Sequence, residues 1–592
     1  MLNFAIVTVG DGRVDPADLD LLDRHADSSL TFVPTHRHRW SSRSGRTVLV
    51  AWSCSPRTIP TSGAWGSGVL AAYARRSSPG PTASPGSDWL ARIQPSNGPL
   101  RVPERTLEVA VGAIANDDDR AIAFSDHLGT GSLFTSKSGR TTIVSDRAGV
   151  AAALLVSPQR SPLSVSWMVN WFSSLDDSTG YRGVQHVEPG AEMRWNGERW
   201  RLHRRDPEWF DQPETSLDDP LLGPMLDAAA EELVSAVRNL PEGVPIQVGL
   251  TGGRDSRLVL AAVLASGRSN VTAFTMQGSE QPNADGLVAA GLARATGVAH
   301  AVRGGAARTP MSPDVYLERL KCHVFRSEAA LPAAELRWQA DESAEIVLDG
   351  TGGELFRAKF DDSHAVNSTA EAVELIMRRM AGRNSILRPS VIEHQYDVIR
   401  SMLEEFAVTV PASDLVHRMY FEIFTRRWIG ADEALNGFRP QVRLLRNRQA
   451  LCASRAVGWH GRRIEYIHLS LWHRLRPDLA RLAFASAPLG PAANAMFGPG
   501  HATEAVVRNY DWGSPKGVTW DTLRDGCRRQ IGTGESAVDE FVDRSRLDEL
   551  LAQPVVTDQR LLRQVQGVTA AAIWLTGSED RSARNIGTTS FS

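Results

Sequence analysis

The segment GLTGGRDS, Gly249 to Ser256, is the most informative part of the sequence for the fold. It follows the short apolar run VPIQVGL (244–250), and the longer apolar run RLVLAAVLASG (257–267) comes directly after it. A short apolar run bounded by turn residues is typical of a buried strand, and a longer one is typical of a helix. The segment is therefore predicted to be the turn that leads from a strand into a helix.

The residues of this turn suit an anionic ligand. Gly252 and Gly253 let the backbone approach a ligand closely, and the N–H groups and dipole at a helix N-terminus favour an anion such as phosphate. Thr251 and Ser256 offer hydroxyl groups, and Asp255 can hold a magnesium ion against the phosphates. The alternative is a structural turn in which Asp255 or Ser256 caps the helix.

The pattern after this turn predicts a parallel sheet. A second apolar run, NVTAFTM (270–276), is followed by another helical one, LVAAGLARATG (287–297). Strands that alternate with helices are typical of a parallel sheet with helices on both faces. A polar, proline-containing stretch precedes this pattern, so we expect a linker at 206–220, a second domain at 221–576 and a mobile polar tail at 577–592.

The first part of the chain, 1–205, is predicted to be a β-rich domain. Short apolar or alternating runs at 107–114, 121–126 and 141–146 are typical of strands joined by turns. The stretch 76–103 is rich in Pro, Gly and Ser, which predicts a long surface loop inserted between strands.

Composition indicates a soluble, two-domain protein. The chain has 592 residues, 42% of them hydrophobic and 22% charged, with a net charge of −3. Such a balance gives no overall basic field for nucleic acid or an anionic membrane, so neither is expected as a partner. The cysteines lie too far apart for a disulfide framework or zinc cluster, and no export signal is recognised, so a cytoplasmic location is expected. The four cysteines are Cys54, Cys322, Cys452 and Cys527.

The TGGRDS segment resembles the SGGxDS signature of the ATP pyrophosphatase, or PP-loop, family, with Thr251 in place of the first serine. This resemblance implies that ATP, with Mg²⁺, is cleaved between its α- and β-phosphates. It also implies that Leu250, Asp349 and Gly350 line the nucleotide site. The segment 273–297 resembles the second strand and helix of the family, which implies that Met276 lies beside the adenine; a core methionine is the alternative.

The segment LDGTGGELF (348–356) resembles the loop that asparagine synthetases write as SGEGxDELF, although it is one residue shorter. Thr351 stands at a catalytic position where asparagine synthetase has a glutamate and β-lactam synthetase a tyrosine. Threonine cannot act as a base at neutral pH, so the general base is not identified. Glu354 serves for the Asp-Glu pair of the family and is the predicted second magnesium ligand beside Asp255; a helix-capping carboxylate is the alternative.

The segment WGSPKGVTW (512–520) resembles the late loop of this family, in which a lysine stabilises the adenylate and the departing pyrophosphate. The resemblance assigns that catalytic role to Lys516, and a solvated surface lysine is the alternative. None of the four lysines of the chain stands in a P-loop of the type GxxxxGK[ST].

Two N-terminal segments, 125–155 and 181–205, resemble the glutaminase domain of asparagine synthetases. Glutamine hydrolysis there depends on an N-terminal cysteine. This chain begins Met1-Leu2 and has no cysteine before Cys54, so we expect a degenerate, structural domain. The expected fold is thus a degenerate Ntn-glutaminase-like β-rich sandwich, followed by a PP-loop synthetase domain with a parallel sheet and a helical C-terminal part.

The function that these resemblances imply is an ATP-dependent amide ligase, which adenylates a carboxylate and captures it with an amine. β-Lactam synthetases and lasso-peptide cyclases are precedents, so the substrate is a small molecule or a peptide, and a precursor peptide with its protease are possible partners. An ammonia-dependent asparagine synthetase is one alternative. A catalytically inactive, nucleotide-binding scaffold is an alternative of another class.

Overall fold

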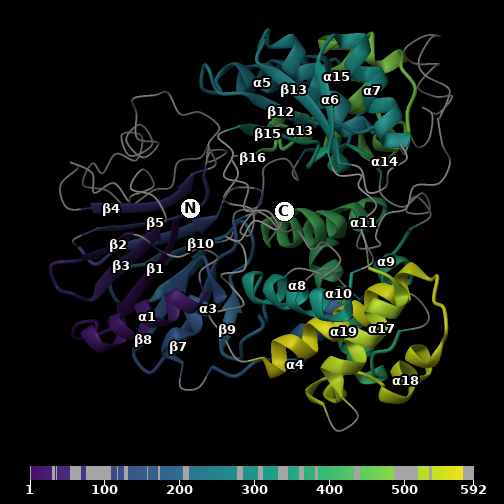
Figure 1. Ribbon diagram of the computed structural model, residues 1–592. Coiled ribbons are helices and arrows are strands. Elements are labelled where there is room, and N and C mark those ends of the chain that lie inside the picture. The colour runs from purple at the N-terminus through teal and green to yellow at the C-terminus, as the bar shows by residue number, and fades with distance from the viewer. Residues whose placement is uncertain are drawn as a thin grey trace.

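A computed structural model of the chain describes residues 2–29, 34, 36–53, 68–74, 109–116, 118–125, 128, 131–155, 158–170, 174–203, 212–276, 284–303, 311–330, 345–358, 366–380, 385–431, 441–485, 518–532 and 536–577. Three parts lie side by side (Figure 1): a β-sandwich, a parallel sheet with its helices, and a lobe made of helices. The predicted loop at 76–103 and the predicted tail from residue 578 onward lie outside these residues.

The β-sandwich consists of two antiparallel sheets. The described strands of the first sheet run in the order β2 (His36–Ser41), β3 (Thr47–Ser53), β1 (Leu2–Val9), β8 (Thr141–Ser145), β7 (Phe134–Ser138) and β9 (Val184–His186). Those of the second run in the order β11 (Trp200–His203), β10 (Glu192–Trp195), β6 (Ala121–Ser125), β5 (Val109–Asn116) and β4 (Gly68–Ala74). The strands predicted at 107–114, 121–126 and 141–146 are confirmed as β5, β6 and β8, shifted by at most two residues.

Strand β1 is apolar on both faces because the first sheet is covered on both sides. Phe4 and Ile6 point into the core between the two sheets. Ala5 and Val7 belong to a second core, on the outer face, with residues of helix α1 (Pro16–Ser29) and of the short helix α3 (Ala148–Ala151). Successive side chains of a strand point to opposite faces, so the apolar run from Phe4 to Val7 supplies both cores.

The second half of the chain builds a five-stranded parallel sheet, in the order β14-β13-β12-β15-β16. From the middle strand β12 (Ile246–Gly249) the chain passes through α6 (Arg254–Ala265) to β13 (Val271–Met276), and through α7 (Ala284–Thr296) to β14 (Ala299–Arg303). It returns to the other side of β12 as β15 (Ile346–Leu348) and β16 (Gln441–Val442). The order of the strands therefore reverses between β12 and β15, the place where open α/β sheets bind ligands.

The mixed α/β architecture is confirmed, with antiparallel sheets first and a parallel sheet after them. At β13 the structure differs from the prediction that helices cover both faces of the parallel sheet. There Ala273 and Thr275 are buried, whereas Thr272 and Met276, which point the other way, are exposed. This face of β13, which lies between the edge strand β14 and the middle strand β12, is thus only partly covered.

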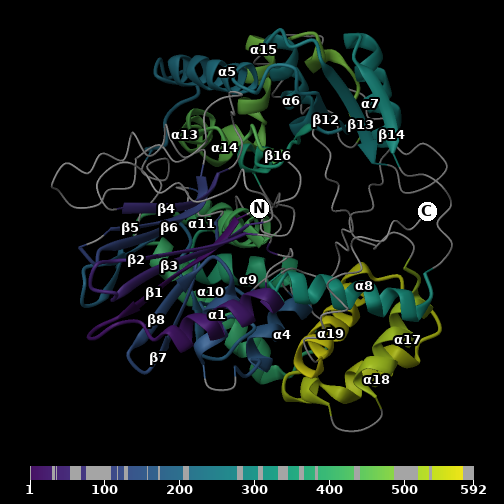
Figure 2. The same ribbon diagram turned by 60° about the vertical axis from the view of Figure 1, so that its left-hand side comes forward.

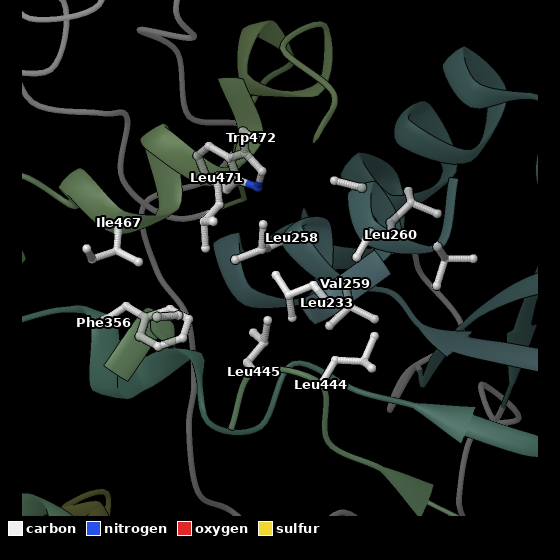
Figure 3. Close-up of a cluster of buried hydrophobic side chains, with 14 of the residues drawn as sticks. Leu233, Leu258, Val259, Leu260, Phe356, Leu444, Leu445, Ile467, Leu471 and Trp472 are labelled. Carbon is white, nitrogen blue, oxygen red and sulfur yellow. The ribbon is translucent and has the colours of Figure 1, made fainter. Parts of the chain in front are cut away.

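Helices from distant parts of the sequence complete the core around the parallel sheet. Figure 3 shows Leu258 and Leu260 of α6 together with Phe356, Leu445 and Trp472, all from segments far along the chain. Besides α6 and α7, the helices α5 (Leu222–Arg238), α13 (Arg448–Ala456) and α15 (Tyr466–Leu475) contribute residues to this core, and α14 (Gly458–Arg463) connects α13 to α15. They cover apolar surface that one strand-helix unit cannot bury by itself.

The helical lobe lies below the parallel sheet, beside the sandwich, and both views show this placement (Figures 1 and 2). Its elements are α8 (Pro313–Arg326), α9 (Thr369–Met380), α10 (Pro389–Phe406), α17 (Trp520–Ile531), η8 (Ala537–Glu540), α18 (Arg544–Ala552) and α19 (Gln559–Thr576). Helix α11 (Ala412–Tyr420), which continues as the π-helix η6 (Phe421–Trp428), lies between this lobe and the sheet. Of the helices described, none is both long and apolar enough to cross a membrane.

Helix α4 (Pro162–Asn170) ties the sandwich to this lobe. Met168 of α4 shares a core with residues of α8, α17 and α19, while Trp167 belongs to a core with α9, α10 and α11. Gly567 of α19 faces the backbone of α4, and a Cβ atom at that position would lie 2.4 Å from the carbonyl oxygen of Met168. The close approach of the two helices therefore requires a glycine.

Candidate active site

The two predicted motifs meet at the carboxyl ends of β12 and β15. Gly350, in the loop after β15, lies against the first turn of α6, and a Cβ atom there would be 2.7 Å from the backbone nitrogen of Ser256. A Cβ atom at Gly353 would lie 2.4 Å from the Oδ1 atom of Asp255. The loop after β15 thus packs directly on the TGGRDS turn, and only glycines permit this approach.

Hydroxyl groups tie the TGGRDS turn together. The backbone N–H of Thr251 donates to the Ser256 Oγ atom at 3.1 Å, and the two side-chain oxygens are 2.9 Å apart. The Gly253 N–H donates to the Thr251 Oγ1 atom at 3.1 Å. Gly253 is the N-cap of α6, and no side chain caps the helix. The predicted alternative, in which Asp255 or Ser256 acts as the helix cap, is therefore not what the structure shows.

A carboxylate already accepts an N–H group of this turn. The buried N–H of Gly252 donates to the Oδ1 atom of Asp285, at 2.8 Å, and Asp285 is itself 6% exposed. One backbone donor of the turn is thus directed at an anionic oxygen, as the donors of a phosphate-binding loop are. Asp285 lies in the segment 273–297, and its only signal in the sequence is that of an acidic residue in the first turn of a helix.

A separate segment closes over the turn. The carbonyl of Gly252 accepts the N–H of Ala485 at 3.1 Å, and a Cβ atom on Gly252 would lie 2.3 Å from the Cβ of Ala485. Arg257 of α6 holds this segment in place, because its guanidinium donates to the carbonyls of Leu479, Leu482 and Ala483. The Cζ atom of Arg257 also lies 3.8 Å from the centre of the Phe484 ring. Gly252 is therefore needed for packing, apart from any role toward a ligand.

Both carboxylate oxygens of Asp255 are engaged by side chains that the sequence analysis did not single out. Arg357 donates from Nη2 to Oδ2 at 2.7 Å, and His468 Nε2 lies 2.8 Å from Oδ1. His468 is fully buried, in α15, whereas Arg357 directly follows the 3-10 helix η4 (Gly353–Phe356). Arg357 stands one residue beyond the quoted LDGTGGELF motif, and His468 carried no signal in the sequence.

The loop after β15 is held by its own carboxylates. Asp349 Oδ1 accepts the N–H of Thr351 at 2.9 Å, and Glu354 Oε2 accepts the N–H of Gly352, the N-cap of η4, at 2.8 Å. Gly352 has a φ of +106°, a conformation that favours glycine. Among the residues described, no group of three His, Cys, Asp or Glu side chains is placed to share a metal ion. The assignment of Asp255 and Glu354 as magnesium ligands stays a prediction.

The electrostatics of this edge depend on a small group of buried charges. Burial alone would lower the pKa of the Arg357 guanidinium, but the carboxylates around it, with Asp255 the strongest, raise it. Burial raises the pKa of the Tyr420 phenol well above its usual value, and the nearby Glu354 carboxylate raises it further. Arg254 forms an ion pair with Glu465. At neutral pH Arg357 is therefore charged and Tyr420 is neutral.

The remaining predicted residues have different outcomes. Leu250 is buried, and its carbonyl accepts the hydroxyl of Thr275 at 2.7 Å. Met276 ends β13 and is 53% exposed, so the alternative of a core methionine is wrong, and contact with adenine stays a prediction. Lys516 lies outside the described residues, whereas Val518 and Trp520 from the end of the same segment pack on the core of the helical lobe.

A cavity of about 530 Å³ lies elsewhere, between the sandwich and the helical lobe. Residues of the sandwich, including Gln159 and Arg182, line one side, and Glu540 and Leu575 line the other. None of the residues predicted for the nucleotide site lines this cavity. It is therefore not the place where the sequence motifs meet.

Comparison with known proteins identifies no family. No protein-family model matches the chain, and no curated protein matches it. Among solved structures, the chain is similar to a glutamine phosphoribosylpyrophosphate (PRPP) amidotransferase from B. subtilis, complexed with ADP and GMP, at 10% sequence identity and a TM-score of 0.22. The match covers 51% of this chain and 90% of that chain. A likeness of this degree bears on neither the fold nor the function of this chain.

Proposed function

We propose that this chain is an ATP-dependent ligase that adenylates a carboxylate and captures it with an amine. The observation that carries the proposal is the meeting of two loops at the switch point of the parallel sheet, with Gly350 packed on the backbone of Ser256. Ligands of open α/β sheets bind at this place. The motifs in both loops resemble those of enzymes that transfer AMP to a carboxylate.

The TGGRDS turn would hold the phosphates of ATP. Gly252 already directs its N–H at the carboxylate of Asp285, and α6 begins without a side-chain cap, so the turn and the helix N-terminus suit an anion. The hydroxyls of Thr251 and Ser256 lie on the same turn. Leu250, Asp349, Gly350 and Met276 complete the proposed nucleotide site.

Magnesium would accompany the triphosphate and neutralise charge that builds up as pyrophosphate leaves. Asp255, Asp349 and Glu354 are the carboxylates of the two motifs at this edge. The resemblance to asparagine synthetases assigns Lys516 to the stabilisation of the adenylate. Thr351 lacks the acidity of a base, so the amine has to arrive neutral or lose its proton to another group.

The test is carboxylate-dependent exchange of radiolabelled pyrophosphate into ATP, which reports adenylation without knowledge of the amine. The full-length protein would be incubated with ATP, Mg²⁺ and a panel of carboxylates, including aspartate and acidic peptides, followed by hydroxylamine to trap the acyl group. We expect exchange with one class of carboxylate, and AMP rather than ADP as product. Formation of ADP and phosphate would overturn the proposal.

A second candidate, a scaffold without catalysis, is favoured by one observation. Both oxygens of Asp255 are engaged by Arg357 and His468. A scaffold would bind ATP, or a partner, without any exchange across the panel. An ammonia-dependent asparagine synthetase would instead convert aspartate with ammonium and leave the peptides untouched.

A further inference from the structure

Arg357 places a fixed positive charge at the edge where the two motifs meet. Its guanidinium is bound to Asp255, 102 residues away in the sequence, and the Arg357 side chain is 28% exposed. His468 binds the other oxygen of that carboxylate from the buried side. Asp255 is therefore held between a buried imidazole and a partly accessible guanidinium.

Two further carboxylates lie near this guanidinium, and one of its N–H groups has no acceptor among the described residues. Glu465 and Glu354 add to the negative potential that Asp255 exerts on Arg357. The buried Nε–H group of Arg357 has no hydrogen-bond partner among the described residues. A buried donor without an acceptor is costly, and an anionic ligand would satisfy it.

We propose that Arg357 is the resident cation of this site: Asp255 positions its guanidinium to receive an anionic oxygen of the ligand, and no divalent ion is bound to Asp255 in the free protein. The identity of that anion, a phosphate of ATP or the substrate carboxylate, rests on the proposed function. A planar guanidinium suits either oxygen, because its N–H groups form a fork. The only divalent ion at this edge would be the one that arrives with ATP.

The first arm of the test needs no nucleotide. Mn²⁺ is titrated into the free protein and unbound Mn²⁺ is counted by electron paramagnetic resonance, for wild type and for Asp255→Asn. We expect the two proteins to bind Mn²⁺ equally. A Mn²⁺ site in the wild type that disappears in Asp255→Asn would overturn the proposal.

The second arm measures the affinity for α,β-methylene-ATP with Mg²⁺ by calorimetry, and the carboxylate concentration that gives half-maximal pyrophosphate exchange. Loss of one charge-assisted hydrogen bond predicts that Arg357→Gln weakens one of these about tenfold to a hundredfold, with Arg357→Lys in between. If the affinity for the nucleotide falls, the anion that Arg357 binds is a phosphate of ATP. If a higher carboxylate concentration is needed, the anion is the carboxylate of the substrate. If the nucleotide affinity and the half-maximal carboxylate concentration of Arg357→Gln both equal those of the wild type, Arg357 does not bind the anion and the proposal is overturned.

Two controls separate folding from binding. Arg268→Gln removes an arginine at the opposite edge of the same sheet, where it donates to the carbonyls of Leu240 and Pro241, and should leave both affinities unchanged. Circular dichroism checks each variant, and Arg357→Lys serves if Arg357→Gln does not fold. If the wild type binds no nucleotide, the proposed function fails, while the first arm still decides whether Asp255 holds a metal.

Discussion

Replacement of Gly252 by alanine should destabilise the protein, because the space beside this residue is filled. The new Cβ atom would lie 2.3 Å from the Cβ of Ala485 and 3.0 Å from the Cβ of Val288, whereas carbon atoms in contact are about 3.5–4.0 Å apart. The segment at Ala485 has to move by more than about 1 Å, which strains its hydrogen bond to the Gly252 carbonyl. Overpacking costs about 1–3 kcal/mol and a lost hydrogen bond about 1 kcal/mol, so we expect a loss of about 2–4 kcal/mol.

Gly253→Ala is the matched control, one residue along the same turn. Gly253 has a φ of −83°, which any residue adopts, and its Cβ atom would meet only the Thr251 Oγ1 atom, at 3.2 Å. The free energy of unfolding of Gly253→Ala should stay within about 1 kcal/mol of that of the wild type. Urea unfolding followed by circular dichroism measures both variants. Equal stability of Gly252→Ala and Gly253→Ala would refute the packing argument, whereas reduced ATP binding in a stable Gly253→Ala would indicate that phosphate approaches this glycine.

Other predictions concern charges and contacts away from this turn. Burial raises the pKa of Asp146 to about 7. Between about pH 4 and 7 the folded protein therefore keeps a proton on Asp146 that the unfolded chain has lost. The free energy of unfolding should fall across this range, by at most about 4 kcal/mol, and then level off. Asp146→Asn should remove that slope in urea unfolding measured from pH 4 to 8, and an unchanged slope would contradict the assignment. Gly567→Ala should loosen α19 from α4, because the added Cβ would meet backbone atoms near Met168; a melting temperature equal to that of wild type would count against it. Asp414→Asn should cost about 3–5 kcal/mol, since it leaves the buried Arg455 and Arg462 without their counter-charge, and a thermal melt that matches wild type would argue against this role.

The local structure around the motifs could be predicted from the sequence. Apolar runs and turn residues predicted β12, the glycine turn, α6 and β13 within a few residues, because periodicity and turn chemistry act over a few neighbouring positions. The same reasoning predicted a β-rich first part and a parallel sheet in the second. It failed on the partly covered face of β13, because which faces are covered depends on where a strand lies in the sheet.

The contacts of the acidic residues in the motifs could not be predicted from the sequence and depend on the packing of distant segments. Asp255 reads as a magnesium ligand in the sequence, yet in the fold it is bound by Arg357 and His468. Asp285 likewise reaches the turn from another helix. No local pattern marks such pairs, because their energy comes from charges that approach one another only after distant segments pack. The motifs identify candidate residues of a site, and the tertiary structure determines which of their oxygen atoms remain available to a ligand.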